Sequence, residues 1–319
     1  MAMTRPDDIR YADVWQDAST VPADAAVVAI LGVPQHIGVE RNGGRPGAAL
    51  APDAIRTAFG RLATSATIDA INAGALAIVD LGNVPCEGRT LEEIHAAQRA
   101  VVGDALSRGW LPITLGGGHD VAYPTMQAMS DVHSTWACIN IDAHADVRPL
   151  LQGALAHSGS PFRQAIDEGH LHGRRFAEFG LQHISVSKPH LDWLNHQGAH
   201  ITMLDDVRTA GTRTAFQQAL HHVGNVPLYV SIDVDAVSSA WAPGVSAPAS
   251  DGLTPWDLTQ IIAAAIATGH LAAVDIVEVN PAFDTDGRTA RLAATFIAEV
   301  CKGLCAYCTY DLPASQPRS

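Results

Sequence analysis

Six side chains that could bind metal ions lie in three short segments of the chain, each directly after an apolar run. In chain order they are His119, then Asp142, His144 and Asp146, then Asp233 and Asp235. Residues at i, i+2 and i+4 of a strand project to the same face, so the members of one segment would point together. Carboxylates that are this close repel one another unless a cation lies between them. The spacing therefore predicts a site for a pair of hard divalent ions.

Each of these residues, taken singly, has a more ordinary explanation. A His after a glycine run is usually a turn residue, and an Asp after a strand is usually a helix cap. The dense D-x-H-x-D and D-x-D patterns together favour metal binding. Two imidazoles and four carboxylates suit Mn²⁺ better than metals that prefer thiolates. Two such ions, about 3.5 Å apart, lower the pKa of a shared water. Asp142 and Asp233 are the candidates to bridge them.

Apolar, β-branched runs alternate with helical patterns along the whole chain. The runs predict strands over residues 26–33, 75–81, 111–115, 136–141, 182–186, 200–204, 228–232 and 272–277. Several are apolar throughout, which is typical of parallel strands covered on both faces. We therefore expect an α/β fold with a mostly parallel sheet, in one domain over residues 1–319. An open sheet and a closed barrel are both compatible with the pattern, and in either case ligands gather at the carboxyl ends of the strands.

Helix-start signals support this alternation. Thr90 and Glu93 form a capping box before segment 94–106, and Thr254 and Pro255 provide an N-cap and an N1 proline before segment 258–268. Helical patterns also cover residues 121–129, 189–196, 214–222 and 289–308. The glycines at 116–118 lack the Gly-Lys-Ser/Thr ending of a phosphate loop, so they predict a tight turn that brings His119 to the metals.

Composition excludes several classes of protein. A formal net charge of −13 argues against nucleic-acid binding, which requires basic surfaces. No signal-like segment begins the chain, and its longest apolar stretch is interrupted by Gly269, His270 and Asp275, so we expect a cytoplasmic protein without a membrane span. The five cysteines indicate free thiols. Cys301, Cys305 and Cys308 have the spacing of some iron–sulfur ligands, but a buried helix face explains them better.

At the metal-ligating residues the chain resembles the ureohydrolase family, which contains arginase, agmatinase and formimidoylglutamase. The resemblance extends from about residue 30 to residue 294 and rests on G-G-G-H at 116–119, D-A-H-A-D at 142–146, S-I-D-V-D at 231–235 and E-V-N-P at 278–281. It implies a three-layer α/β/α fold with a mostly parallel eight-stranded sheet. It also implies two Mn²⁺ ions per subunit, held by the six residues named above, and a homo-oligomer, either a trimer or a hexamer.

Further stretches resemble formimidoylglutamases in particular, at residues 38–48, 158–162, 242–248 and 286–291. Arginases and agmatinases usually have G-G-D-H-S where this chain has G-G-G-H-D. Asp120 stands where formimidoylglutamases usually have Glu, and Ala145 stands where they usually have Phe, which predicts a reshaped pocket. His157 lies one residue from the position of the family's proton shuttle and could take that role after a small loop shift.

The resemblance also implies how the site would work. The electrophile in this family is a planar, cationic amidine carbon, and Glu278 could hold it through two parallel charge-assisted hydrogen bonds. Asp146 could accept a proton from the attacking water and pass it to the leaving amine. Arg148 is the first candidate to bind an amino-acid tail, with further candidates at Arg41, Arg45, Ser158 and Arg288. Each arginine taken alone could equally form a surface ion pair.

These observations predict a manganese-dependent hydrolase of C–N bonds in linear amidines. The preferred substrate is N-formimidoyl-L-glutamate, which water would convert to L-glutamate and formamide in histidine degradation. A guanidino compound (arginine, agmatine or a guanidino acid) that releases urea is the alternative within the family. Outside the family, the alternatives are an inactive, metal-stabilised interaction protein and a dinuclear phosphoesterase. The complete ligand set argues against the former, and the lack of a phosphate cradle argues against the latter.

Overall fold

The computed structural model describes residues 8–310 of the chain, and their side chains through residue 305. Residues 1–7, and with them nearly all of the segment considered for a signal peptide, lie outside the described part, as do residues 311–319. Eight strands form one sheet in the order β2-β1-β3-β8-β7-β4-β5-β6. Their bounds are β1 (Ala26–Gly32), β2 (Leu76–Asn83), β3 (Leu111–Leu115), β4 (Ala137–Ile141), β5 (Phe176–Leu181), β6 (His200–Met203), β7 (Leu228–Asp233) and β8 (Leu271–Val277).

Every pairing between neighbouring strands is parallel. The sheet begins at β2 and ends at β6, so it is open rather than closed into a barrel. All residues of β3, β4, β5 and β7 are buried, which explains why these runs do not alternate with polar residues. The single sheet takes strands from both halves of the chain, and one domain over residues 1–319 stays a prediction.

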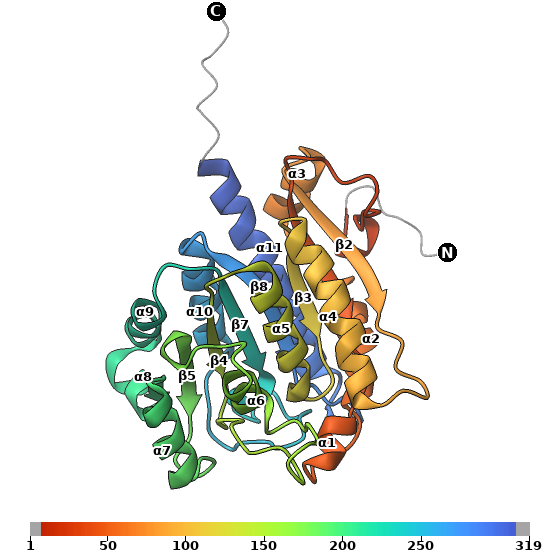
Figure 1. Cartoon of the computed structure of the whole chain (residues 1–319). Helices are drawn as coiled ribbons and strands as arrows, with labels where there is room; N and C mark the ends of the chain where they lie inside the picture. The colour runs from red at the N-terminus through yellow and green to blue at the C-terminus, as the bar shows by residue number, and fades with distance from the viewer. Residues whose placement is uncertain (1–7, 311–319) are drawn as a thin grey trace, which may run out of the picture.

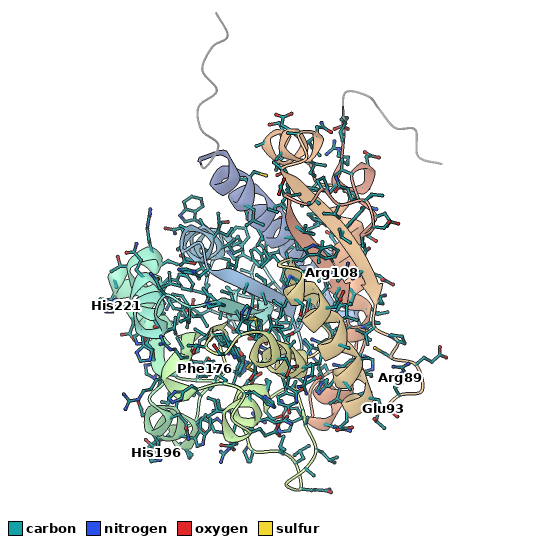
Figure 2. The ribbon with its side chains drawn as sticks, turned by 45° about the horizontal axis from the view of Figure 1, so that its top comes forward. Arg89, Glu93, Arg108, Phe176, His196 and His221 are labelled. Carbon is teal, nitrogen blue, oxygen red and sulfur yellow. The ribbon has the colours of Figure 1, made fainter. Side chains whose placement is uncertain are left out.

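Helices cover both faces of the sheet, as the three-layer α/β/α prediction requires (Figure 1). On one face α4 packs against α5, and α5 against α6; on the other, α11 packs against α2, α3 and α10, and α10 against α9. Their bounds are α1 (Ile37–Arg41), α2 (Ala51–Phe59), α3 (Ser65–Asn72), α4 (Leu91–Ser107), α5 (Ala122–Val132), α6 (Pro161–Asp167), α7 (Lys188–Gln197), α8 (Leu204–Ala210), α9 (Thr212–Val223), α10 (Pro255–Ala267) and α11 (Arg288–Tyr310). In Figure 2, Phe176 lies inside the packed layers, whereas Arg89, Glu93 and His196 project outward.

Seven of the eight predicted strands are found within two residues of their expected bounds, but the strand predicted over 182–186 is wrong. The fifth strand runs over Phe176–Leu181 instead, and the backbone N–H groups of Ser185 and Val186 turn back to donate to the Gln182 carbonyl oxygen. The buried acid Glu178 and Gly180, whose φ is +97°, interrupt the apolar pattern of the true strand. The helices α1, α2, α3, α6 and α8 were not predicted.

The predicted helix starts are confirmed. Thr90 Oγ1 accepts a hydrogen bond from the Glu93 N–H, and the Glu93 carboxylate accepts one from the Thr90 N–H. Thr254 caps α10 in the same way. In α11, Cys301 and Cys305 are buried among apolar side chains, which favours the packing interpretation; the Cys308 side chain lies outside the described part. Among the described helices, none has the length and hydropathy needed to cross a bilayer.

Candidate metal centre

The candidate residues lie at the carboxyl ends of four neighbouring strands in the middle of the sheet. In the order β3, β8, β7 and β4, these strands lead to His119, Glu278, Asp233 and Asp142. Parallel strands bring these ends to one edge, so residues far apart in sequence come into contact. The Glu278 carboxylate, for example, accepts a hydrogen bond of 2.9 Å from the backbone N–H of His119.

The glycine run before His119 forms the predicted tight turn. A Cβ atom on Gly117 would lie 1.6 Å from the Gln35 carbonyl oxygen, so any other residue would push the two segments apart. The Gly117 carbonyl also accepts a hydrogen bond of 2.9 Å from the Glu278 N–H, which fixes the turn against the end of β8. The glycines therefore serve close backbone packing that orients His119.

The first group of possible ligands surrounds the imidazole of His119. Its Nδ1 atom lies 3.1–3.2 Å from one carboxylate oxygen of each of three residues, Asp142, Asp146 and Asp233. Its Nε2 atom lies 2.9 Å from the Ser231 hydroxyl oxygen, and that hydroxyl donates to Asp275. Because the hydroxyl proton points at Asp275, Ser231 can only accept from the imidazole, and Nε2 carries the proton. The Nδ1 lone pair is then free to face a cation.

The second group surrounds His144. Its Nδ1 atom lies 3.1 Å from Asp235 Oδ2 and 3.5 Å from Asp142 Oδ1. Asp142 therefore contributes one oxygen to each group, and within each group the ligand atoms lie within 4.8 Å of one another. This supports Asp142 as the bridging residue. Asp233 belongs to the first group only, and its Oδ1 accepts the Asp235 N–H at 2.8 Å.

Both groups carry more negative charge than the protein itself neutralises. Burial raises the pKa of Asp233 well above its ordinary value and, with repulsion from Asp142, that of Asp235 to about 6. Burial alone would lower the pKa of His119, but hydrogen bonds to three carboxylates raise it well above its usual range. Positive charge is therefore required between these side chains. Divalent cations would satisfy all of them at once, so the residues fit a pair of metal ions.

Glu278 belongs to neither ligand group, yet one of its carboxylate oxygens has no partner. Oε2 is buried and accepts no hydrogen bond from any described residue. Burial raises the pKa of this carboxyl to about 8. Its backbone φ is +62°, and that of Asp146 is +45°, a left-handed conformation that is costly for residues other than glycine. Strain of this kind is typical of functional sites, and the open oxygen suits an amidinium cation.

A cavity of about 300 Å³ opens over these groups. Its walls come from the loop before α2, the loop after β4 and the loop before α10, and its lining residues are Asn42, Gly43, Gly44, Arg45, His144, Asp146, Arg148, Ser158, Asp233, Asp235, Ser246, Ala247 and Glu278. Two predicted tail-binding arginines and Ser158 are therefore brought together with both ligand groups.

The two arginines of this cavity are held differently. Arg148 Nη1 donates to Asn42 Oδ1 at 3.1 Å, and Asn42 in turn donates to the Ser158 hydroxyl at 3.1 Å. No carboxylate in the described part of the chain pairs with Arg148. The Arg45 guanidinium donates to the Ser246 and Val245 carbonyl oxygens, but no described residue accepts from its Nη1. Both arginines therefore keep a positive charge available to a ligand.

Three residues predicted to act on the substrate, rather than to bind metal, do not line the cavity. Arg41 pairs with Glu92 at 2.8 Å, and Arg288 donates to the Ala240 carbonyl oxygen. His157 is buried, with Nε2 3.1 Å from the Pro149 carbonyl oxygen and Nδ1 accepting from the Gly159 N–H. Both ring nitrogens of His157 are thus occupied, and a proton-shuttle role would require the loop to move.

The two departures from the formimidoylglutamase motifs lie behind the cavity. Asp120 is buried, and its Oδ2 accepts from Gln35 Nε2 at 2.8 Å and contacts His95 Nε2 at 2.9 Å. Ala145 is buried in the apolar core. Neither side chain lines the cavity, so these changes would act on its walls through packing.

The sequence did not point to the residues that orient Arg148 and the metal-ligand candidate His119. Asn42 orients Arg148, and the Ser231–Asp275 pair fixes the tautomer of His119. Asp275 could have been noticed as a lone acid within an apolar strand. Nothing in the local pattern connects Asn42 to Arg148, because the two are 106 residues apart in the chain.

Comparison with known proteins agrees with this geometry. The model of the Arginase family matches residues 26–302. The chain is 34% identical to the formimidoylglutamase of Rhodococcus opacus (strain B4), over 90% of this chain and 89% of that one. It is 31% identical to the mitochondrial guanidino acid hydrolase of Homo sapiens, over 87% and 77%. The crystal structure of Trypanosoma cruzi formiminoglutamase with Mn²⁺ has a TM-score of 0.86 and 32% identity, and covers 94% of this chain and 99% of that one.

The fold and the site define a hydrolase of C–N bonds in amidines. The chain belongs to the arginase family. Formimidoylglutamases recur among its relatives and structural neighbours, together with guanidino hydrolases. Manganese in the Trypanosoma cruzi neighbour agrees with the possible metal site of this chain.

Proposed function

We propose that this chain hydrolyses N-formimidoyl-L-glutamate to L-glutamate and formamide, with two Mn²⁺ ions per subunit. His119, Asp142, Asp146 and Asp233 would hold one ion, and Asp142, His144 and Asp235 the other. When bound, such a pair supplies a water of lowered pKa near neutral pH. The observation that carries the proposal is a single cavity of about 300 Å³ lined by ligand candidates, an acid with an open oxygen and two available arginines.

The residues of the chain have distinct proposed roles. Glu278 Oε2 would accept a hydrogen bond from the formimidoyl cation and hold its carbon facing the ligand groups. Asp146 would take a proton from the attacking water and return it to the nitrogen that leaves with glutamate. Arg148, oriented by Asn42, would bind one carboxylate of the substrate, and Arg45 the other.

A guanidino acid is the second candidate substrate. The supporting observation concerns the two arginines that line the cavity: among the described residues, the Arg148 guanidinium donates to Asn42 alone, whereas Arg45 donates to two carbonyl oxygens. One free arginine suits a substrate with a single carboxylate tail. Hydrolysis would then release urea and the corresponding amino acid.

Product analysis separates these candidates. The Mn²⁺-loaded protein is incubated with N-formimidoyl-L-glutamate, with guanidino acids of different length, and with arginine and agmatine, and both formamide and urea are measured. We expect formamide from the first substrate, and far slower formamide release by the Glu278→Gln variant. Urea release with no formamide would replace the first proposal by the second. Release of neither product by a metal-loaded protein would support the inactive, metal-stabilised protein.

The setting of this activity is also part of the proposal. Formimidoylglutamate hydrolysis belongs to histidine degradation, and we infer that the chain acts there, in the cytoplasm, as a trimer or hexamer. These inferences rest on the family resemblance. Sedimentation of the Mn²⁺-loaded protein tests the assembly, since a monomer would contradict it.

A further inference from the structure

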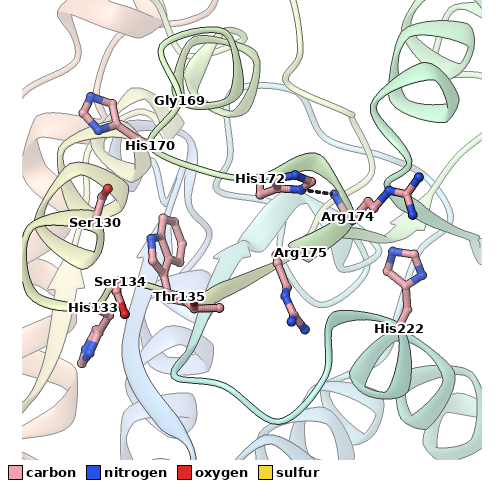
Figure 3. A pocket seen from close by; sticks show the side chains of 11 residues that line it. Ser130, His133, Ser134, Thr135, Gly169, His170, His172, Arg174, Arg175 and His222 are labelled. Carbon is pink, nitrogen blue, oxygen red and sulfur yellow. Dashed lines mark hydrogen bonds between the residues drawn. The ribbon is translucent and has the colours of Figure 1, made fainter.

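A second cavity, of about 680 Å³, lies at the amino ends of the strands, whereas the metal centre lies at their carboxyl ends. It is formed by the loops that enter β4 and β5 and by the last turn of α9, as Figure 3 shows. Its lining residues are Ser130, His133, Ser134, Thr135, Trp136, Gly169, His170, His172, Arg174, Arg175 and His222. The length of β4, about 15 Å for five residues, separates this cavity from the catalytic one. No residue lines both.

The cavity is basic within an acidic protein. The chain has 33 acidic residues against 20 lysines and arginines, yet no Asp or Glu is among the lining residues. Arg56, Arg99 and Arg208 are paired with carboxylates, as is common elsewhere on this surface. In the described part of the chain, no carboxylate forms an ion pair with Arg174 or Arg175.

Nearby contacts leave this positive charge largely in place. Arg175 donates to the Val223 carbonyl oxygen, which holds its guanidinium at the end of α9 without neutralising it. Arg174 makes no side-chain hydrogen bond to any described residue. Glu168 lies 3.7 Å from the His170 ring and forms no ion pair with either arginine. Unpaired arginines also line the catalytic cavity, where the substrate carboxylates are expected.

The other wall offers hydrogen-bond donors. The hydroxyls of Ser130, Ser134 and Thr135 have no hydrogen-bond partner among residues 8–305. In Figure 3 these three residues lie on one side of the space, and Arg174, Arg175 and His222 on the other. The buried Trp136 also lines the cavity. Donors from two directions together with an aromatic ring in the lining suit an organic anion.

A metal ion is a poorer occupant of this cavity. The described groups whose ligand atoms converge within 4.8 Å are the two at the catalytic edge, and none includes His133, His172 or His222. Adjacent arginines instead suit oxygens of a phosphate or carboxylate, which they bind through charge-assisted hydrogen bonds.

We propose that this cavity binds a small organic dianion at a site separate from catalysis. The dianion is either a phosphate monoester or a dicarboxylate. Arg174 and Arg175 bind the oxyanion, the three hydroxyls donate to it, and Trp136 packs against the organic part. The cavity is larger than the catalytic one, so the ligand is not restricted to a bare inorganic ion.

Calorimetric titration of the Mn²⁺-loaded protein tests this site. The probes are phenyl phosphate and succinate, each in chloride at matched ionic strength. The test variant is Arg174→Gln, because this side chain has no structural hydrogen bond to lose. Arg213→Gln is the matched control, since Arg213 is an exposed arginine on α9 outside the cavity. Arg148→Gln reports binding in the catalytic cavity.

We expect saturable binding of at least one probe, weakened about tenfold in Arg174→Gln and unchanged in Arg213→Gln and Arg148→Gln. Binding of phenyl phosphate alone identifies a phosphate ester, and binding of succinate alone identifies a dicarboxylate. Absence of saturable binding by either probe overturns the proposal. Binding that is lost in Arg148→Gln and kept in Arg174→Gln also overturns it, because the anion then occupies the catalytic cavity. The titration measures binding and not turnover. Its outcome therefore does not depend on whether N-formimidoyl-L-glutamate is the substrate.

Discussion

Replacing Glu278 by Gln should make the metal-free protein more stable and should strongly reduce the turnover of the Mn²⁺-loaded protein. The carboxyl is buried, one of its oxygens is unpartnered, and Asp235 repels its charge, so its pKa is raised to about 8 from an ordinary 4.5. At about 1.4 kcal/mol for each pKa unit, this rise in pKa corresponds to a loss of at most about 5 kcal/mol in the free energy of unfolding when Glu278 is ionised. Gln has the same shape without the charge.

The sign of the effect follows from the raised pKa. Below pH 4.5 the carboxyl is protonated in both the folded and the unfolded chain, so its ionisation costs nothing. As the pH rises towards 8, the unfolded chain ionises freely and the folded one resists, which destabilises the wild-type protein. Between pH 5 and pH 8 the stability gained by the Gln variant over wild type should therefore grow by about 3 kcal/mol.

Urea denaturation of both metal-free proteins at several pH values measures this difference. Glu87→Gln, on an exposed surface loop, is the matched control and should show no such pH trend. With Mn²⁺ present, Glu278→Gln should keep its metal content and lose about 100- to 1000-fold in kcat/KM, because charge-assisted hydrogen bonds to the amidinium are removed. A stability difference that does not change with pH, or normal turnover of the variant, would refute the reasoning.

Three further predictions concern the metals and the substrate tail. Asp235→Ala should lower the manganese content from two ions per chain towards one by elemental analysis, and two retained ions would contradict the ligand assignment. Ser231→Ala should weaken Mn²⁺ binding about 10- to 100-fold in chelator competition, since His119 loses its orienting partner; unchanged affinity would exclude that role. Arg148→Gln should raise KM far more than it lowers kcat, whereas Arg163→Gln, at a half-buried arginine of α6 that does not line the cavity, should change neither. An unaltered KM would remove Arg148 from tail binding.

The sequence by itself determined the residues that could bind metal and the kind of fold that carries them. A strand repeats every two residues, so D-x-H-x-D and D-x-D define clusters of ligands without knowledge of the partner strands. Continuous apolar runs similarly indicate a covered parallel sheet. The fifth strand escaped detection because Glu178 lies inside it, and a buried acid cannot be recognised from local pattern.

Only the tertiary structure decided which of these residues meet. The order β3-β8-β7-β4 brings Asp142 into both ligand groups and leaves Asp233 in one. It also sets Arg148 against Asn42, and it separates Arg41 and Arg288 from the cavity although the sequence offered both, like Arg45, as candidates to bind the substrate tail. Strand order depends on how helices from distant parts of the chain pack on the two faces of the sheet, and local spacing carries no information about such long-range contacts.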